Sequence, residues 1–394
     1  MGEKIKMTSR ERVLAAINHK EPDKVPIDLG GTICTTITAK ANEKLKEFLK
    51  ITKSGEIIIH PFLDVVLPLP EILDLFETDC RTVRLKGPSD ESEKVEERGG
   101  FSQVSLSDKP QGHSILDEYG TRWQKCGFDY SPVEYPLKEA ELSDIKKYPW
   151  PDPYNRGRVR GLRKEALELH ENTDFCIMAD IMCGGPYENA LWLRGFDRFL
   201  MDLVSNEKFA RYLLDKITDL DIGFWDAQLS AIGEYVDVVC QGDDLGMQTG
   251  LQISPEIYRK FIKPCHKKIY SFIRSKTKAK IWMHSCGSIY DIIPDLIEVG
   301  AEVLNPVQCS ARNMGLKKLK KEYGKDIAFW GGGFNVQRIP FMTEKEIREN
   351  VKEVICTMAP GGGYIFASTH NILPETSGRS IYTAYATAKK YRNY

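Results

Sequence analysis

The feature that most constrains the fold is a regular alternation of short apolar segments and amphipathic segments after residue 154. Each apolar segment has the length of a strand, and each is followed by a segment with helical periodicity. Buried parallel strands covered by helices produce this pattern. The predicted strands cover residues 175–180, 236–240, 280–284, 302–305, 327–330 and 363–368.

One or two further strands are expected near the N-terminus, at 25–31 and 80–85. Together with the six later strands they favour an α/β fold of the (β/α)8 TIM barrel type over an open doubly wound sheet. No GxGxxG segment follows the first strand, which disfavours a dinucleotide-binding fold. Because such barrels often use about 250 residues or more as one unit, residues 1–394 are interpreted as a single domain.

Two regions differ from the repeats. Residues 1–87 are predicted to form an N-terminal helical extension, with helices over 8–17, 39–49 and 68–76. Residues from about 88 to 153 are polar and rich in turns, and a hairpin around Tyr119-Gly120 indicates an inserted β-hairpin layer. The main barrel repeats then occupy 154–394, with two of their helices expected over 187–204 and 206–229.

Composition restricts the possible partners and the compartment. The net charge is −1 and no long basic run occurs, so nucleic acid and anionic membranes are not expected partners. The apolar runs are too short for a membrane span, and the N-terminus does not resemble a signal peptide, so a cytoplasmic location is expected. Ten cysteines without a CxxC pair do not predict a disulfide framework.

Polar residues recur where the predicted strands end. In a (β/α)8 barrel the active site lies at the C-terminal ends of the strands, so these residues would meet at one mouth. Each one alone has an ordinary turn or capping explanation, which stays open for Asp180 and Gln308 in particular. Their recurrence at equivalent positions predicts an active site. The residues are Asp180, Asp243, Asp244, His284, Cys286, Gln308, Trp330, His370 and Asn371.

His284 and Cys286 indicate a metal site. Residues i and i+2 of an extended segment point to the same side, and imidazole with thiolate is a zinc-type ligand set. A catalytic zinc ion needs three protein ligands and one open position. His370 is the candidate third ligand, although a capping or substrate-binding role stays open for it. Cys309 is the alternative ligand, and Cys356 is expected to be a core residue in a helix.

Asp243 and Asp244 are the candidate catalytic residues. Adjacent strand residues point oppositely, so one carboxyl is expected to enter the pocket and the other to brace the barrel. A carboxyl beside apolar walls would have a raised pKa and could donate a proton; the alternative is a pair of solvated loop acids. Met182, Met247 and Trp330 indicate an apolar pocket for a planar substrate. The full set of expected substrate-binding residues is Asp180, Met182, Tyr187, Met247, Gln308, Trp330 and Asn371.

A combination of short segments links the chain to a known superfamily. They are Arg10-Glu11-Arg12-Val13, Glu21-Pro22-Asp23-Lys24-Val25-Pro26, Asp243-Asp244-Leu245-Gly246, Ile253-Ser254-Pro255-Glu256, Tyr258-Arg259-Lys260-Phe261, His284-Ser285-Cys286-Gly287 and Asn305-Pro306-Val307-Gln308. On these segments the chain resembles the uroporphyrinogen decarboxylase superfamily over most of its length. Within that superfamily it resembles the cobalamin-dependent methyltransferase branch.

The differences within the superfamily narrow the resemblance. The decarboxylase needs an arginine-rich segment after the Val-Pro element, whereas residues 27–32 here read Ile-Asp-Leu-Gly-Gly-Thr. Thiol-directed methyltransferases of the superfamily hold zinc with His-x-Cys and a later cysteine, which His370 replaces in this chain. The chain looks more like the O-demethylase members, which pass a methyl group from a methoxylated aromatic compound to a corrinoid protein.

The resemblance therefore implies a methyltransferase that demethylates a methoxylated aromatic compound and methylates cob(I)alamin on a partner corrinoid protein. Zinc would be held by His284, Cys286 and His370, and Asp243 or Asp244 would act as the acid. The alternatives are methyl transfer from methylcobalamin to a thiol of the coenzyme M type, a decarboxylase-like activity, and a non-catalytic corrinoid-binding protein. A homodimer is one open possibility for the oligomeric state.

Overall fold

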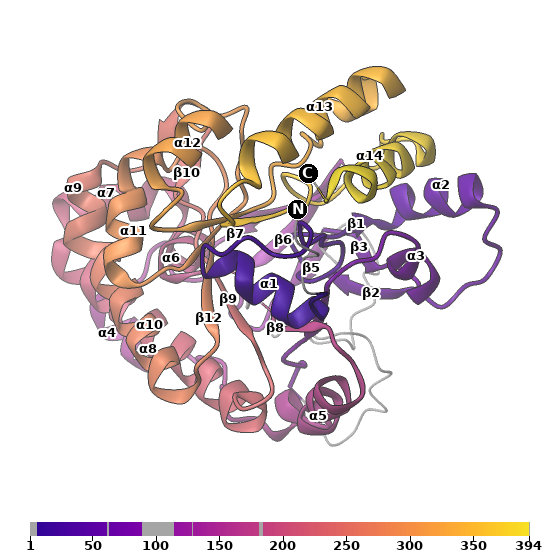
Figure 1. Cartoon of the computed structure of the whole chain (residues 1–394). Helices are drawn as coiled ribbons and strands as arrows, with labels where there is room; N and C mark the ends of the chain where they lie inside the picture. The colour runs from indigo at the N-terminus through magenta and orange to yellow at the C-terminus, as the bar shows by residue number, and fades with distance from the viewer. Residues whose placement is uncertain (1–5, 61–62, 89–113, 128, 181–183, 394) are drawn as a thin grey trace.

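A curled parallel sheet forms the centre of the computed structural model, which describes residues 6–60, 63–88, 114–127, 129–180 and 184–393 (Figure 1). Its seven strands are ordered β15-β14-β13-β12-β9-β8-β4. The order follows the chain, as in a barrel built from successive strand–helix repeats. The strands are β4 (Cys80–Val83), β8 (Cys176–Ala179), β9 (Val238–Gly242), β12 (Lys280–His284), β13 (Val303–Asn305), β14 (Ala328–Trp330) and β15 (Tyr364–Ile365).

The segment around Ile27 takes the place of an eighth strand. Ile27 forms a parallel bridge with Phe366, just beyond β15. On its other side, the Ile27 carbonyl accepts a hydrogen bond of 2.7 Å from the amide of Asp79, the residue before β4. The predicted (β/α)8 fold is therefore confirmed, with its first strand reduced to a bridge. The strand ends early because Gly30 adopts a φ of 86° and turns the chain.

Helix α1 (Ser9–Ile17) covers the N-terminal end of the barrel. The Arg10 amide donates to the carbonyl of Asp174 at 2.7 Å, and the Gly363 amide donates to the carbonyl of Ala16 at 2.8 Å. Asp174 and Gly363 precede β8 and β15, so α1 lies across the starts of the strands, as Figure 1 shows. The C-terminal ends of the strands lie on the opposite side.

The outer helices follow the predicted alternation with one correction. The single helix expected over 187–204 is two helices, because Gly195 adopts a φ of 91° and interrupts it. The major helices are α5 (Leu162–Asn172), α6 (Pro186–Arg194), α7 (Phe196–Ser205), α8 (Glu207–Ile232), α10 (Lys263–Lys276), α11 (Ile293–Val299), α12 (Leu316–Tyr323), α13 (Glu344–Met358) and α14 (Gly378–Tyr391). Shorter helical turns are η1 (Arg156–Val159), α9 (Pro255–Ile257), η2 (Tyr258–Ile262), η3 (Tyr290–Ile292) and η4 (Ile339–Phe341).

The N-terminal extension contains the expected helices α2 (Ala39–Leu49) and α3 (Pro70–Leu75), and also a small antiparallel sheet that the sequence did not predict. That sheet has the order β1-β3-β2. Its short strands lack a clear alternation of apolar and polar residues, which explains the omission. They are β1 (Ile37–Thr38), β2 (Ile57–His60) and β3 (Val65–Leu67).

The inserted layer is an antiparallel sheet in which the expected hairpin at Tyr119-Gly120 joins β5 (Ser114–Leu116) to β6 (Arg122–Cys126). Strand β7 (Asp129–Glu134) pairs with the other edge of β6, and α4 (Leu142–Lys147) follows. Residues 89–113 of the predicted insertion lie outside the described residues. A two-stranded ribbon, β10 (Gly246–Met247) with β11 (Gly250–Leu251), stands after β9.

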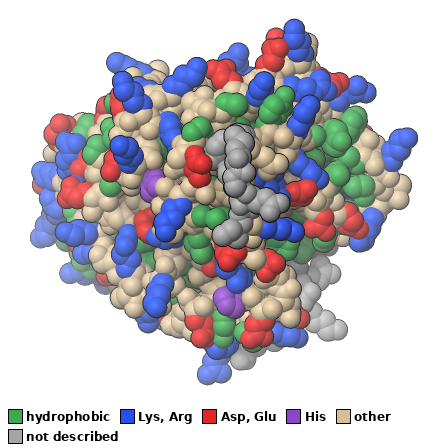
Figure 2. All heavy atoms as spheres, viewed as in Figure 1, with side chains coloured by type: hydrophobic (Ala, Val, Ile, Leu, Met, Phe, Trp, Pro, Cys, Tyr) green, Lys and Arg blue, Asp and Glu red, His purple; other side chains and the backbone are tan. Residues whose placement is uncertain are grey.

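The described helices include none that is long and apolar enough to cross a membrane. On the face shown in Figure 2, basic and acidic side chains are interspersed over the surface. This distribution agrees with the formal net charge of −1.

Candidate functional site

His284, the last residue of β12, is oriented by Asn305 at the end of the neighbouring strand β13. Its Nδ1 atom lies 2.7 Å from Asn305 Oδ1. The Nδ2 atom of Asn305 donates to the carbonyl of Trp330 at 3.0 Å, so the Oδ1 atom faces the histidine. Nδ1 of His284 therefore carries the hydrogen, and Nε2 keeps its lone pair. Proteins hold metal-binding histidines in this way.

Cys286 and Asp244 stand beside the Nε2 atom of His284. Cys286 Sγ lies 3.5 Å from Nε2, and Asp244 Oδ1 lies 3.7 Å from it. Zinc binds imidazole at about 2.0–2.1 Å and thiolate at about 2.3 Å, so neighbouring ligands on a tetrahedral ion are roughly 3.5 Å apart. The spacing of His284 and Cys286 fits this geometry.

The backbone of the Cys286 turn is held by two side chains. Asp244 Oδ1 accepts the amide of Cys286 at 2.7 Å, and Gln308 Oε1 accepts the amide of Gly287 at 2.8 Å. Burial raises the pKa of the Cys286 thiol well above its ordinary value, with the Asp244 carboxylate adding to the effect. A bound metal would have to displace that proton.

His370 and Cys34 approach His284 as well. The ring centroids of His284 and His370 are 5.7 Å apart. Among the described residues, the ligand atoms of Cys34, His284 and His370 lie within 4.8 Å of one another, and so do those of Asp244, His284 and Cys286. The predicted trio of His284, Cys286 and His370 is thus divided between two sets that share His284. Burial, with His284 adding to it, lowers the pKa of His370 to about 4, so its imidazole is neutral at neutral pH.

The sequence analysis missed Cys34. This residue lies in the loop of residues 28–36, which enters the barrel mouth. The Ile33 amide donates to both carboxylate oxygens of Asp180, at 3.2 and 3.1 Å, and Asp180 also pairs with Arg84 Nε at 2.7 Å. Asp180 therefore positions the loop. Because Cys34 follows the end of the first predicted strand, the positional rule that selected His284 would have found it.

The other two cysteines considered from the sequence lie apart from these two sets. Cys309 is half-buried in the loop after β13. Cys356 was expected in the core, but this was wrong, because its side chain is exposed on α13. Its position on the helix faces solvent, whereas Ile355 beside it packs in the core.

Asp243 and Asp244 face opposite ways. Asp243 is fully buried and accepts hydrogen bonds from the amides of Tyr187 and Glu188, at 3.1 and 2.9 Å, in the first turn of α6. It also lies 2.9 Å from Nε2 of His266 on α10. Asp243 therefore braces the helices against the barrel, and Asp244 is the member of the pair that reaches the site.

Glu188, in the first turn of α6, is an acid that the sequence analysis also missed. It is half-buried, and burial raises its pKa well above the ordinary value, with Asp244 and Asp243 adding to the effect. It therefore keeps a proton at a pH at which an ordinary carboxyl has lost it. In the sequence it looks like any acidic residue in a first helical turn, where the helix dipole favours negative charge.

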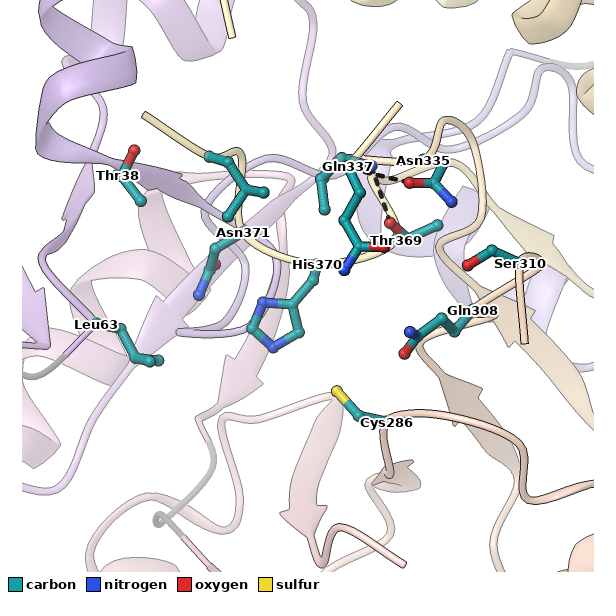
Figure 3. A pocket seen from close by; sticks show the side chains of 12 residues that line it. Thr38, Leu63, Cys286, Gln308, Ser310, Asn335, Gln337, Thr369, His370 and Asn371 are labelled. Atoms are coloured by element: carbon teal, nitrogen blue, oxygen red, sulfur yellow. Dashed lines mark hydrogen bonds between the residues drawn. The ribbon is translucent and has the colours of Figure 1, made fainter. Parts of the chain in front are cut away.

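A cavity of about 320 Å³ adjoins Cys286 and His370. Both residues lie at the edge of the cavity in Figure 3, where the Cys286 sulfur points toward the His370 ring. Seven of the cavity's twelve lining residues carry amide or hydroxyl groups, although most of the lining surface is apolar, and in the described part of the chain no aromatic side chain except the His370 imidazole contributes. Its other lining residues are Thr38, Leu63, Gln308, Ser310, Asn335, Val336, Gln337, Thr369, Asn371 and Leu373.

Asn371, one of the residues that line this cavity, has a hydrogen-bond donor that is buried behind the lining surface. Its Oδ1 atom accepts the amide of Thr36 at 3.0 Å, which fixes the orientation of the side chain. Its Nδ2 atom is buried without a hydrogen-bond partner among the described residues. A buried donor left unpaired costs free energy, so this position favours a ligand that carries an acceptor.

Those of the remaining expected substrate-binding residues that the structure describes lie elsewhere. Trp330 is fully buried in the barrel interior, where its Nε1 donates to Asp28 Oδ2 at 2.8 Å. Tyr187 is buried in α6, and Met247 is half-exposed on β10. Met182 lies outside the described residues. The described cavity is therefore lined by other residues than the side chains from which the apolar pocket was expected.

Comparison with known proteins identifies the family. A family model described as uroporphyrinogen decarboxylase (URO-D) matches residues 125–391, which is more than half of the chain. The chain belongs to the uroporphyrinogen decarboxylase family. A comparison with curated protein sequences found no match.

A solved methyltransferase structure shares this fold. The chain is similar to a methyltransferase from Methanosarcina mazei with a TM-score of 0.62 and 18% sequence identity, covering 98% of this chain and 99% of that one. A B12-independent methionine synthase from Shewanella sp. W3-18-1, in complex with selenomethionine, matches with a TM-score of 0.39 and 12% identity, covering 58% of this chain and 65% of that one. The fold shared with the methyltransferase covers nearly the whole length of both chains.

Proposed function

We propose that the protein is a methyltransferase that takes the methyl group of a methoxylated compound and passes it to cob(I)alamin on a partner corrinoid protein. The observation that carries the proposal is the oriented pair of His284 and Cys286 beside a cavity at the C-terminal mouth of the barrel. The whole-length likeness to a structure named as a methyltransferase supports the same class of reaction.

Zinc suits these residues because nitrogen and sulfur donors stand at the spacing of a tetrahedral site. His284 Nε2 and Cys286 Sγ would hold it, and a bound zinc ion would polarise the ether oxygen as a Lewis acid. Asn305 keeps the His284 lone pair directed at the site, and Asp244 holds the amide of Cys286.

The leaving group needs help from the protein. When the methyl group passes to cobalt(I), the electron pair of the broken C–O bond stays on the oxygen as an alkoxide or phenolate. Such a group departs readily only if its charge is stabilised or protonated. Glu188 lies close enough to Asp244 and Cys286 for the charges to influence one another, and its raised pKa would let it supply such a proton.

The cavity indicates how the substrate is recognised. Its volume of about 320 Å³ suits a small molecule. Gln308, Asn335 and Gln337 offer amide groups along its wall, and Asn371 adds an unpaired donor. We therefore propose a small methoxylated compound with further hydrogen-bonding groups. The aromatic ring expected from the sequence has no aromatic partner in the described lining other than His370.

The direct test is methyl transfer to reduced cobalamin. Full-length protein is mixed with cob(I)alamin, free or on a corrinoid protein, and with aromatic or aliphatic methoxylated compounds, and the absorbance of methylcobalamin is followed. We expect methylation with the wild type and Cys309→Ala, and none with His284→Ala. Transfer only from methylcobalamin to a thiol, release of CO₂ from uroporphyrinogen, or corrinoid binding without turnover would each overturn the proposal in favour of its respective alternative.

A further inference from the structure

We propose that Cys34 is a thiolate ligand of the metal in this protein, so that the N-terminal loop of residues 28–36 completes the metal site. This inference rests on the proposed function, because it adds a ligand to the same site. It assigns a chemical role to a residue that lies 250 positions before His284 in the sequence and on a different part of the barrel.

The two ligand sets must serve one ion. They share His284, whose Nδ1 atom is engaged by Asn305, so only Nε2 is available to a metal. One nitrogen lone pair binds one ion. An ion at Nε2 can therefore take ligands from both sets, Cys286 from one and Cys34 from the other.

Cys34 fits the role better than the other candidates on its side of the ion. His370 offers a neutral imidazole and lines the cavity, whereas Cys34 offers a thiol that is only 7% exposed and would give the ion a second sulfur ligand beside Cys286. With Cys34 as the ligand, the imidazole of His370 is left facing the substrate. His284, Cys286 and Cys34 then give one nitrogen and two thiolate ligands, with a fourth position open, as a catalytic zinc site requires.

The loop that carries Cys34 is held rigidly. Its Ile33 amide binds the Asp180 carboxylate, and the Cys34 amide donates to Thr32 Oγ1 at 3.1 Å. At the start of the loop, Asp28 accepts the Gly31 amide at 2.8 Å and is fixed by the indole of Trp330. A ligand supported by such contacts does not need to be ordered when the metal binds.

The test counts sulfur ligands and does not depend on turnover. Zinc K-edge X-ray absorption is recorded on the zinc-loaded full-length wild type and on Cys34→Ala, Cys34→Ser, Cys286→Ala and Cys309→Ala. We expect two sulfur scatterers at about 2.3 Å in the wild type and in the Cys309→Ala control. We expect one in each of the other three variants. Cys34→Ser preserves the size of the side chain, and circular dichroism confirms that each variant is folded.

Cobalt(II) substitution gives a second readout. The thiolate-to-cobalt absorption of the wild type should fall by about half in Cys34→Ser and stay unchanged in Cys309→Ala, since the intensity follows the number of thiolate ligands. Chelator competition should also show weaker zinc binding in Cys34→Ser than in the control.

The outcomes separate this inference from the proposed function. A wild type with a single sulfur ligand, lost only in Cys286→Ala, would overturn the role of Cys34 without affecting methyl transfer. Loss of a sulfur in Cys309→Ala instead of Cys34→Ala would assign the ligand to Cys309. Two sulfurs that depend on Cys34, in a protein that does not methylate cobalamin, would uphold the inference and overturn the proposed function. A wild type that binds no zinc overturns the role of Cys34.

Discussion

Asn305 accepts a hydrogen bond of 2.7 Å from Nδ1 of His284 while its own amide group donates to the carbonyl of Trp330. The second bond decides which end of the amide faces the histidine, and so fixes the histidine tautomer. The neighbouring strands β12, β13 and β14 each supply one partner, so the strands of the barrel set the orientation of this candidate metal-binding nitrogen.

Substitution of Asn305 tests this relationship. Asn305→Asp still presents an acceptor to His284, whereas Asn305→Leu presents none. Because loss of such a supporting group typically weakens metal binding by about 10–100-fold, we expect a loss of that size in Asn305→Leu and a much smaller one in Asn305→Asp. Zinc affinity is measured by chelator competition. Equal losses in the two variants would show that the acceptor does not act through the histidine.

Much of the barrel could be predicted because its strands are local features. The apolar run that ends at His284 was expected over the bounds that β12 has, since strand length and the following glycine are both visible in the sequence. The placement of residues at strand ends follows from topology. That rule brought His284, Cys286, Gln308, His370 and Asn371 to one cavity or its edge.

The missed features depend on contacts between distant segments. The Ile33 amide donates to the carboxylate of Asp180, which lies 147 positions later in the sequence. No periodic pattern of apolar residues predicts that contact. The direction of Trp330 into the barrel interior depends on Asp28, which is 302 positions away. Periodicity reports which face of an element is apolar, but it cannot tell whether that face lines a cavity or fills the core.

Gly287 allows the turn after Cys286 to lie against the β10–β11 ribbon. Its φ is 80°, and a Cβ atom there would lie 2.4 Å from the carbonyl carbon of Gly246. Gly287→Ala should therefore lower the free energy of unfolding by about 1–3 kcal/mol or more and should impair zinc binding. Urea denaturation and zinc content measure the two effects.

Gly315→Ala is the matched control for this prediction. A Cβ atom at Gly315 would meet nothing within 4 Å. We expect its zinc content to equal that of the wild type and its stability to change by less than about 1 kcal/mol, because Gly315 is the N-cap of α12. If Gly287→Ala behaved in the same way, the turn would not be constrained by its contact with Gly246.

The buried pair of Arg84 and Asp180 is predicted to be strongly coupled. Their side chains are 10% and 0% exposed, and the Nε–Oδ2 distance is 2.7 Å. Removing one member deprives a buried charge of its ion pair, so Asp180→Leu and Arg84→Met should each cost about 3–5 kcal/mol. The double variant should lose less than the sum of the two single losses. The unfolding free energies of the wild type, the two single variants and the double variant give the coupling energy of the pair. If the two single losses simply added up in the double variant, the two side chains would not be coupled.

The ion cluster at Glu77 joins the two ends of the chain. Glu77 accepts contacts of 3.1 Å from Lys24, 2.8 Å from Lys389 and 3.2 Å from Arg392. The hydrogen bond from Lys389 is the largest cause that lowers the pKa of Glu77, to about 2 from an ordinary value of 4.5. The carboxylate therefore stabilises the folded state above pH 4.5, and that contribution is lost as the pH falls from 4.5 to about 2.

Glu77→Gln removes this contribution. We expect the variant to have a lower free energy of unfolding than the wild type near neutral pH, and to lose less stability on acidification through the same window. High salt should reduce the difference, because the cluster is partly exposed and screened. Glu43→Gln, which changes an exposed carboxyl 3.8 Å from Lys40, serves as the control and should follow the wild-type curve. Urea denaturation at a series of pH values measures both curves. Parallel curves for Glu77→Gln and the wild type would show that the three cations do not hold the Glu77 carboxyl ionised.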